Sequence, residues 1–203
     1  MPRHPISILA AAAAVALALG AAQAAQPCCD FSGPAADARW GIQSSVCIDI
    51  GEVHIRPLFM NGQPFEAGKP EDPCLRRQDR QIAGGVSPAL QGAYVAMQIV
   101  PSQRVRTLRM RFAQEQGADG RRPSFIEVNG GKHEFAGLLS KVNGHTLGQG
   151  RPRRAQVRAE LAPTGAASLW HAGTLALRAM QGGIDQVTIG TPFFRADDVG
   201  IER

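Results

Sequence analysis

The chain lacks the residue patterns by which many enzymes are recognised from sequence. It contains no G-x-S-x-G nucleophile elbow and no H-E-x-x-H zinc motif. His133-Glu134 lies beside a turn and has no second histidine at helical spacing. Acidic residues are few, and those in strand-like runs alternate with arginine, which disfavours a pair of catalytic carboxylates. We therefore expect no catalysis, and a secreted hydrolase is the weakest function considered.

Long apolar runs are also missing, except at the N-terminus. There, Arg3 and His4 precede an apolar run over residues 6–19, and Ala22-Gln23-Ala24 fits a small-x-small cleavage site. This is the layout of a secretory signal, and its apolar core is shorter than the roughly 20 residues of a retained membrane helix. We expect residues 1–24 to be removed as a signal peptide. Residues 25–203 then form a single periplasmic or extracellular domain that does not span the membrane.

Lysine is scarce, since 19 of the 22 basic residues are arginine, and the formal net charge is +5. A mild positive charge allows acidic partners such as anionic glycans or a membrane surface. Aromatic and basic residues do not interleave as they do in nucleic-acid-binding grooves. Nucleic acid is therefore not an expected partner, and no organic cofactor is expected.

Cysteines number only four: Cys28, Cys29, Cys47 and Cys74. An even number in an oxidising compartment predicts two disulfides. Because a bridge between adjacent residues is strained, Cys28 and Cys29 are expected to pair with Cys47 and Cys74, in an order that the sequence leaves open. The alternative is a copper or zinc site built from the two adjacent cysteines and a histidine. Against it, no C-x-x-C pair occurs and the histidines are scattered along the chain.

Helical periodicity is absent from the mature chain apart from a short candidate at residues 135–142. Residues 105–112 instead alternate, with apolar Leu108, Met110 and Phe112 on one face and Arg109 and Arg111 on the other. Similar runs predict strands at residues 46–50, 53–59, 93–100, 105–112, 124–128, 155–161, 174–180, 186–189 and 198–201. These strands predict an all-β antiparallel sandwich or barrel. Residues 61–92 are expected to form a long loop, tethered by a disulfide at Cys74.

Several short motifs, in order along the chain, resemble secreted bacterial jelly-roll proteins similar to galactose-binding-like carbohydrate-binding modules. They are Cys29-Asp30-Phe31, Arg39-Trp40-Gly41, Phe59-Met60-Asn61-Gly62, Val128-Asn129-Gly130, Phe135, Asn143-Gly144, Gly173-Thr174-Leu175-Ala176-Leu177 and Asp197-Asp198-Val199. The resemblance spans nearly the whole mature chain and implies a jelly-roll β-sandwich. It implies little about function, because one fold hosts many functions.

The same resemblance implies a structural calcium ion between the first and last strands. The matching carboxylates are Asp30 and Asp197 or Asp198, and calcium is usually held by six to eight oxygen ligands. Ser32 stands where related sequences often place a glutamate. The alternative is that Asp197 and Asp198 cap a turn or face solvent.

Two groups of residues are candidates for ligand binding. Trp40 and Trp170 could stack against sugar rings, although tryptophans in such places also seal the ends of a core. Arg109 and Arg111 would form a cationic patch with Arg153 if their segments meet across neighbouring strands, and the alternative is a solvated face. The leading hypothesis is a non-catalytic binding module for glycans or another cell-surface component. Its rival is a structural or assembly protein of the envelope that binds another protein.

Overall fold

The computed structural model describes residues 39–41, 48–50, 52–60, 74–78, 82, 89–115, 124–149, 153–166 and 168–203. The expected signal peptide lies outside these residues, as do Cys28, Cys29, Asp30 and Cys47. Trp40 and Cys74 are described by their backbone alone. Among the described residues, no helix is long and apolar enough to cross a membrane.

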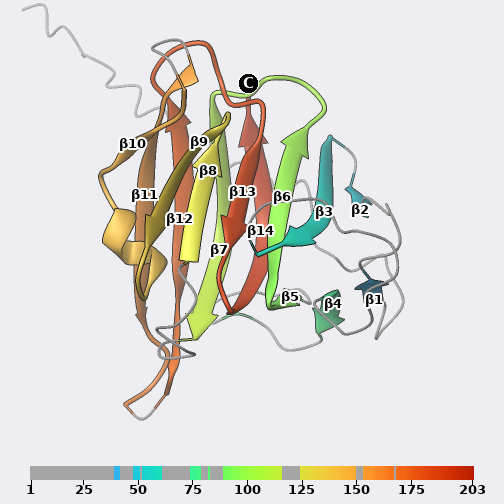
Figure 1. Ribbon diagram of the computed structural model, residues 1–203, viewed down its shortest axis with the longest axis vertical. Helices are drawn as coiled ribbons and strands as arrows, with labels where there is room; N and C mark the ends of the chain where they lie inside the picture. The colour runs from blue at the N-terminus through green and yellow to red at the C-terminus, as the bar shows by residue number, and fades with distance from the viewer. Residues whose placement is uncertain are drawn as a thin grey trace, which may run out of the picture.

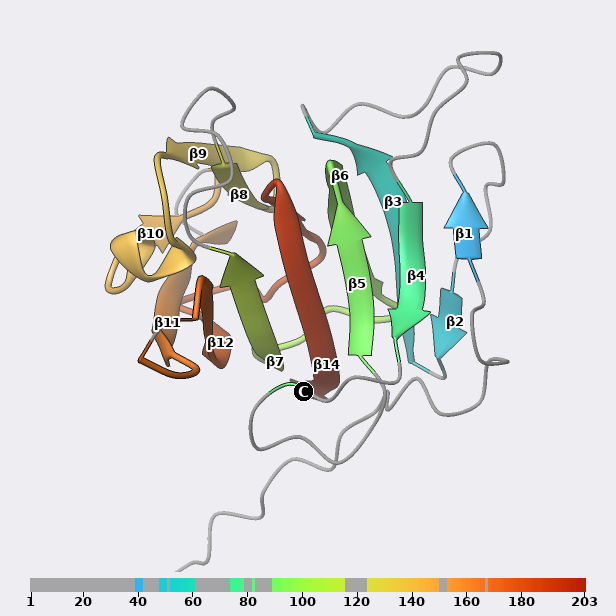
Figure 2. The same cartoon turned by 90° about the horizontal axis from the view of Figure 1, so that it is seen from below.

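The described strands form two antiparallel sheets, which Figures 1 and 2 show as two layers. The eight-stranded sheet has the order β1 (Arg39–Gly41), β4 (Cys74–Gln78), β5 (Ala89–Ala93), β14 (Phe193–Glu202), β7 (Thr107–Glu115), β12 (Trp170–Ala179), β11 (Ala155–Pro163) and β10 (Thr146–Leu147). The six-stranded sheet has the order β2 (Ile48–Ile50), β3 (Val53–Phe59), β6 (Val95–Pro101), β13 (Val187–Gly190), β8 (Ser124–Val128) and β9 (Gly131–Phe135). The all-β prediction is confirmed, and the layers have the arrangement of a sandwich.

The core lies between the two sheets and consists of the apolar side of each alternating strand. On β7, Leu108, Met110 and Phe112 are buried, whereas Arg109 is exposed on the other face. Phe112 stacks on Phe194 of neighbouring β14 with 5.7 Å between ring centroids. From the facing sheet, β3, β6, β8 and β13 contribute Val53, Ile55, Met97, Ile99, Ile126, Val128, Val187 and Ile189 to the same cluster. The period-two patterns of the sequence therefore identify the buried face correctly.

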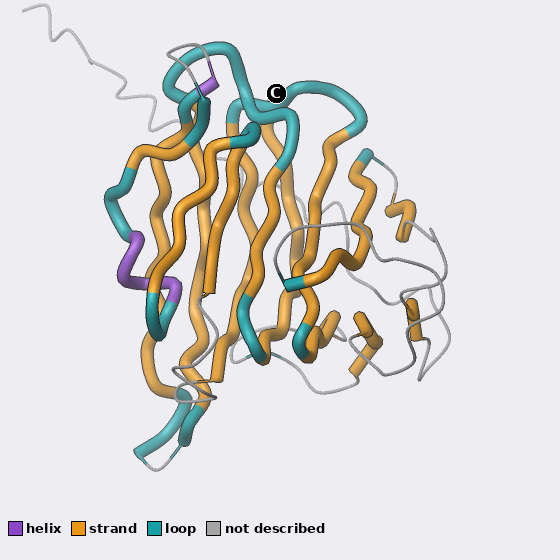
Figure 3. Tube along the Cα trace, viewed as in Figure 1, coloured by secondary structure: helices purple, strands orange, loops and turns teal. Residues whose placement is uncertain are grey.

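Part of the expected loop at residues 61–92 is instead strand, since β4 and most of β5 lie within it (Figure 3). Each of these strands contributes one large side chain to the core, Leu75 from β4 and Leu90 from β5, and both are fully buried. Their short, charged or glycine-containing sequences carry too little alternation to be recognised. β4 and β5 bond with their neighbours in the eight-stranded sheet, so this stretch is not a long loop throughout.

The short helix candidate at residues 135–142 is a single 3₁₀ turn, η1 (Leu139–Val142), with Leu139 and Val142 buried. The side chain of Gln114 on β7 holds its start: Oε1 accepts a hydrogen bond from Leu139 N, and Nε2 donates one to Gly137 O. Gln114 is itself buried, and burying its side-chain amide without hydrogen-bond partners would destabilise the fold. These two bonds supply the partners. η1 covers the side of the molecule near β9, β10 and β11 (Figure 1).

Candidate functional site

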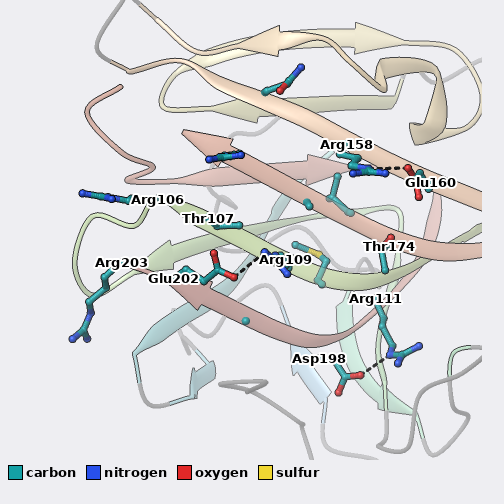
Figure 4. A pocket seen from close by; sticks show the side chains of 16 residues that line it. Arg106, Thr107, Arg109, Arg111, Arg158, Glu160, Thr174, Asp198, Glu202 and Arg203 are labelled. Carbon is teal, nitrogen blue, oxygen red and sulfur yellow. Dashed lines mark hydrogen bonds and ion pairs between the residues drawn. The ribbon is translucent and has the colours of Figure 1, made fainter. Parts of the chain in front are cut away.

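The outer face of the eight-stranded sheet is hollowed over β14, β7, β12 and β11. Register places Arg109 of β7 between Gly200 of β14 and Ala176 of β12, and these small residues leave space beside the long arginine side chain. The hollow has a volume of about 1170 Å³. We call it the arginine hollow (Figure 4), and its lining residues are Arg106, Thr107, Arg109, Met110, Arg111, Gln156, Arg158, Glu160, Thr174, Leu175, Ala176, Arg178, Asp198, Gly200, Glu202 and Arg203.

Each of the three carboxylates that line the arginine hollow is paired with an arginine (Figure 4). Arg109 Nη2 lies 2.8 Å from Glu202 Oε1, and Arg158 Nε lies 2.8 Å from Glu160 Oε1. Arg111 Nε donates to Asp198 Oδ2 at 2.7 Å and is the least exposed of the three arginines. Exposed pairs of this kind contribute only about 0–1 kcal/mol each, so an incoming anion can compete for these arginines at little cost.

Three further arginines leave the hollow with an excess of positive charge. Within the described part of the chain, Arg106 and Arg178 make no ion pair. Arg203 pairs with Glu52, which does not line the hollow. Six arginines therefore face three carboxylates on this surface. Guanidinium groups match the geometry of carboxylate, sulfate and phosphate oxygens, so the arrangement suits an anionic ligand.

Arg104 is close in sequence to these residues but does not line the arginine hollow. Its Nε and Nη2 donate to Asp185 Oδ1 and Oδ2 at 2.7 and 3.3 Å. This hydrogen bonding and the negative charge of Asp185 raise the pKa of the Arg104 guanidinium above its ordinary value. Two nitrogens of Arg104 are therefore engaged by one carboxylate, whereas Arg106 and Arg178 make no such pair within the described residues.

A β-bulge in β14 brings Asp198 to the arginine hollow. The register against β7 shifts between Asp197 and Gly200, and Asp198 has a φ of 49°. A bulge of this kind re-aims the side chains on its strand. Asp197 is fully buried, and its Oδ1 accepts a hydrogen bond from Asp198 N at 2.8 Å.

These contacts bear on the expected calcium site. Asp198 is committed to a guanidinium, and Asp30 lies outside the described residues. No group of three or more histidine, cysteine, aspartate or glutamate side chains suited to a metal ion occurs in the described part of the chain. The calcium site that the resemblance implies therefore stays a prediction.

Trp170 lies on the outer face of the same sheet but in an apolar cluster beyond the hollow. It packs with Ala172 against the buried residues Ile82, Ala89 and Ala113. The guanidinium carbon of Arg195 lies 4.2 Å from the centroid of the Trp170 ring, which is a cation–π contact. Much of the indole is thus engaged in packing, as a tryptophan that seals the end of a core would be.

The structure brings together only some of the residues expected to bind a ligand. Arg109 and Arg111 line the arginine hollow, whereas Arg153 lies in the exposed turn before β11 and does not. The arginines that line the hollow beside Arg109 and Arg111 are instead Arg158 of β11 and Arg178 of β12. Arg158 lies on the polar face of an alternating run, but nothing in that run indicates that it lies two strands from β7 in the sheet.

No family model matches the chain. No curated protein and no solved structure matches it either. The geometry and charge of the arginine hollow therefore carry the functional argument.

Proposed function

We propose that this protein is a secreted, non-catalytic binding module that holds an acidic glycan, or a similar anionic component of the cell surface, in the arginine hollow. The observation that carries the proposal is the ratio of six arginines to three paired carboxylates on one hollowed sheet face. The framework we propose is a jelly roll, exported after removal of residues 1–24 and tied by two disulfides.

Spacing across the sheet favours an extended ligand over a single small anion. Neighbouring strands lie about 4.8 Å apart, so four strands present a surface roughly 15–20 Å wide. Arg109 and Arg111 are two residues apart on β7, which separates them by about 7 Å along the strand. Arg158 and Arg178 lie on the next strands of the sheet, so cationic groups are distributed over the surface. A polymer that repeats a carboxylate or sulfate could contact several of them at once.

The ion pairs preorganise part of the face, and the arginines outside them give it a preference for anions. Arg109, Arg111 and Arg158 are positioned by their carboxylate partners, which reduces the side-chain entropy lost when a ligand binds. Arg106 and Arg178 supply charge that no described carboxylate neutralises. Neutral sugars would gain nothing from this charge, so acidic glycans are the expected class.

A glycan array at low and high ionic strength tests the proposal. We expect binding to acidic glycans that weakens as salt rises, because salt screens exposed charges. The double variant Arg106→Gln/Arg178→Gln should weaken binding about tenfold or more, since hydrogen bonds to charged groups are worth about 1.5–3 kcal/mol. Arg56→Gln is the control, because Arg56 is an exposed arginine on β3 of the other sheet.

Other outcomes of the same array would contradict the proposal. Binding to neutral sugars that Trp170→Ala abolishes while the double arginine variant retains it would place the ligand at the indole. Binding that falls equally in Arg56→Gln would reflect overall charge and not the arginine hollow. Absence of any glycan binding, together with a co-purifying envelope protein, would favour a structural role.

A further inference from the structure

Two histidines that look unrelated in the sequence meet at one side of the molecule. His133 lies on β9, an edge strand of the six-stranded sheet, and His145 immediately precedes β10, an edge strand of the eight-stranded sheet. Their ring centroids are 4.9 Å apart, with an angle of 78° between the ring planes. The two histidines are separated in the sequence, and they meet because the two sheet edges come together beside η1.

The separation of the two rings suits joint coordination of one metal ion. A metal–nitrogen bond is about 2.1 Å long. With the ring centroid about 1 Å beyond the nitrogen, two imidazoles at 90–109° around one ion have centroids roughly 4.5–5.3 Å apart. The observed 4.9 Å falls within this range.

Neither imidazole is committed to another partner in the part of the chain that the structure describes. The contact between the rings is the interaction recorded for both side chains, and neither ring makes a hydrogen bond there. Lys132 and Glu134, which flank His133, pair with each other across 2.8 Å. His145 is exposed and His133 half-buried, so an ion could reach both from solvent.

We propose that His133 and His145 form a binding site for a divalent transition-metal ion, Cu²⁺ or Zn²⁺, with water molecules completing the coordination. Imidazole nitrogen suits these ions, whereas Ca²⁺ and Mg²⁺ prefer oxygen ligands. No third histidine, cysteine, aspartate or glutamate joins the pair among the described residues. The site is independent of the arginine hollow and of the function proposed for it.

Metal binding at this position would join the two sheets at one edge. The Val142–His145 segment connects η1 to β10, with His145 N donating to Val142 O at 3.1 Å. An ion held by both histidines would tie this segment to β9 and restrain the cover formed by η1. Because a ligand that binds only the folded state stabilises it, the melting temperature should rise with metal concentration.

Calorimetric titration of the full chain with CuCl₂ and ZnCl₂, after any free thiol has been blocked by alkylation, tests the site. We expect one ion per chain to bind, a melting temperature that rises with the metal, and no effect of CaCl₂. His133→Gln and His145→Gln should each weaken binding at least tenfold. His54→Gln, which alters a histidine on β3, should leave it unchanged.

A measurement on the protein without substitutions tests the proposal even if a variant fails to fold. The electron paramagnetic resonance spectrum of the Cu²⁺ complex should show two equatorial imidazole nitrogens. A spectrum without nitrogen ligands, or equal affinities in all three variants, would overturn the proposal. If His133→Gln or His145→Gln loses metal binding but keeps glycan binding, the metal site is separate from the arginine hollow.

Discussion

Asn129 offers the sharpest test of how the loops at one end of the sandwich are held. With Gly130 it forms the turn between β8 and β9, and both residues have positive φ, 49° and 81°, as a type I′ hairpin requires. Its buried side chain makes four hydrogen bonds. Nδ2 donates to Arg153 O and Gly183 O, each at 3.0 Å, and Oδ1 accepts from Asp185 N at 2.8 Å and Gln186 N at 3.2 Å.

The free-energy cost of losing this amide follows from the four bonds. Each is worth about 0.5–1.5 kcal/mol net, and solvent can replace part of what is lost, so Asn129→Gly should destabilise the protein by about 2–4 kcal/mol. Glycine tolerates the positive φ, so this variant isolates the hydrogen bonds. Asn129→Ala should cost about 1 kcal/mol more, because alanine is strained in the left-handed region.

Urea denaturation measures these differences. With a slope of about 2 kcal/mol per molar urea, Asn129→Gly should lower the midpoint by roughly 1–2 M. Asn143→Ala is the matched control, since Asn143 also precedes a glycine but has a φ of −58° and accepts one hydrogen bond, from Ala159 N. We expect about 1 kcal/mol for this control. Equal losses in both variants, or an unchanged midpoint in Asn129→Gly, would refute the assignment of Asn129 as the residue that holds these loops.

Two further predictions concern packing and covalent structure. Gly190→Ala should destabilise the protein by about 1–3 kcal/mol, because a Cβ there would lie 2.2 Å from Cε1 of the buried Phe125 ring. Thermal unfolding measures this loss, and unchanged stability would contradict the packing. Protein purified from the periplasm should begin near Ala25 and accept four alkyl groups only after reduction, as intact mass would show. Four groups added without reduction would exclude the two disulfides, each of which is otherwise expected to contribute roughly 2–5 kcal/mol.

The sequence predicted strands best where one face of the strand is buried and the other is exposed to solvent. β3 and β8 have the predicted bounds, and β11 contains the predicted run. β7 overlaps its predicted run, residues 105–112, but begins at Thr107 and extends to Glu115. In each of them every second side chain enters the core, so apolar residues recur at every second position of the sequence. The turn at Asn129-Gly130 has an equally local cause, because few residues tolerate two successive positive φ angles.

Strands that place only one large apolar side chain in the core could not be recognised from the sequence. β4 and β5 each place one leucine in the core, and β9 buries only Phe135 near the edge of its sheet. Such segments are strands because neighbouring strands satisfy their backbone hydrogen bonds: β9 pairs with the adjacent β8, whereas β5 lies between β4 and the distant β14. Local pattern cannot report such pairing.

The sequence by itself determined the all-β class, the buried face of the alternating strands and the surplus of arginine. Only the tertiary structure decided which arginines share a surface: strand order set Arg109 and Arg111 with Arg158 and Arg178, and left Arg153 outside the hollow. It also brought His133 to His145 across the edges of two sheets. The physical reason is that alternation is a property of one strand. A site on a sheet depends instead on hydrogen-bonded register between strands that are remote in the chain.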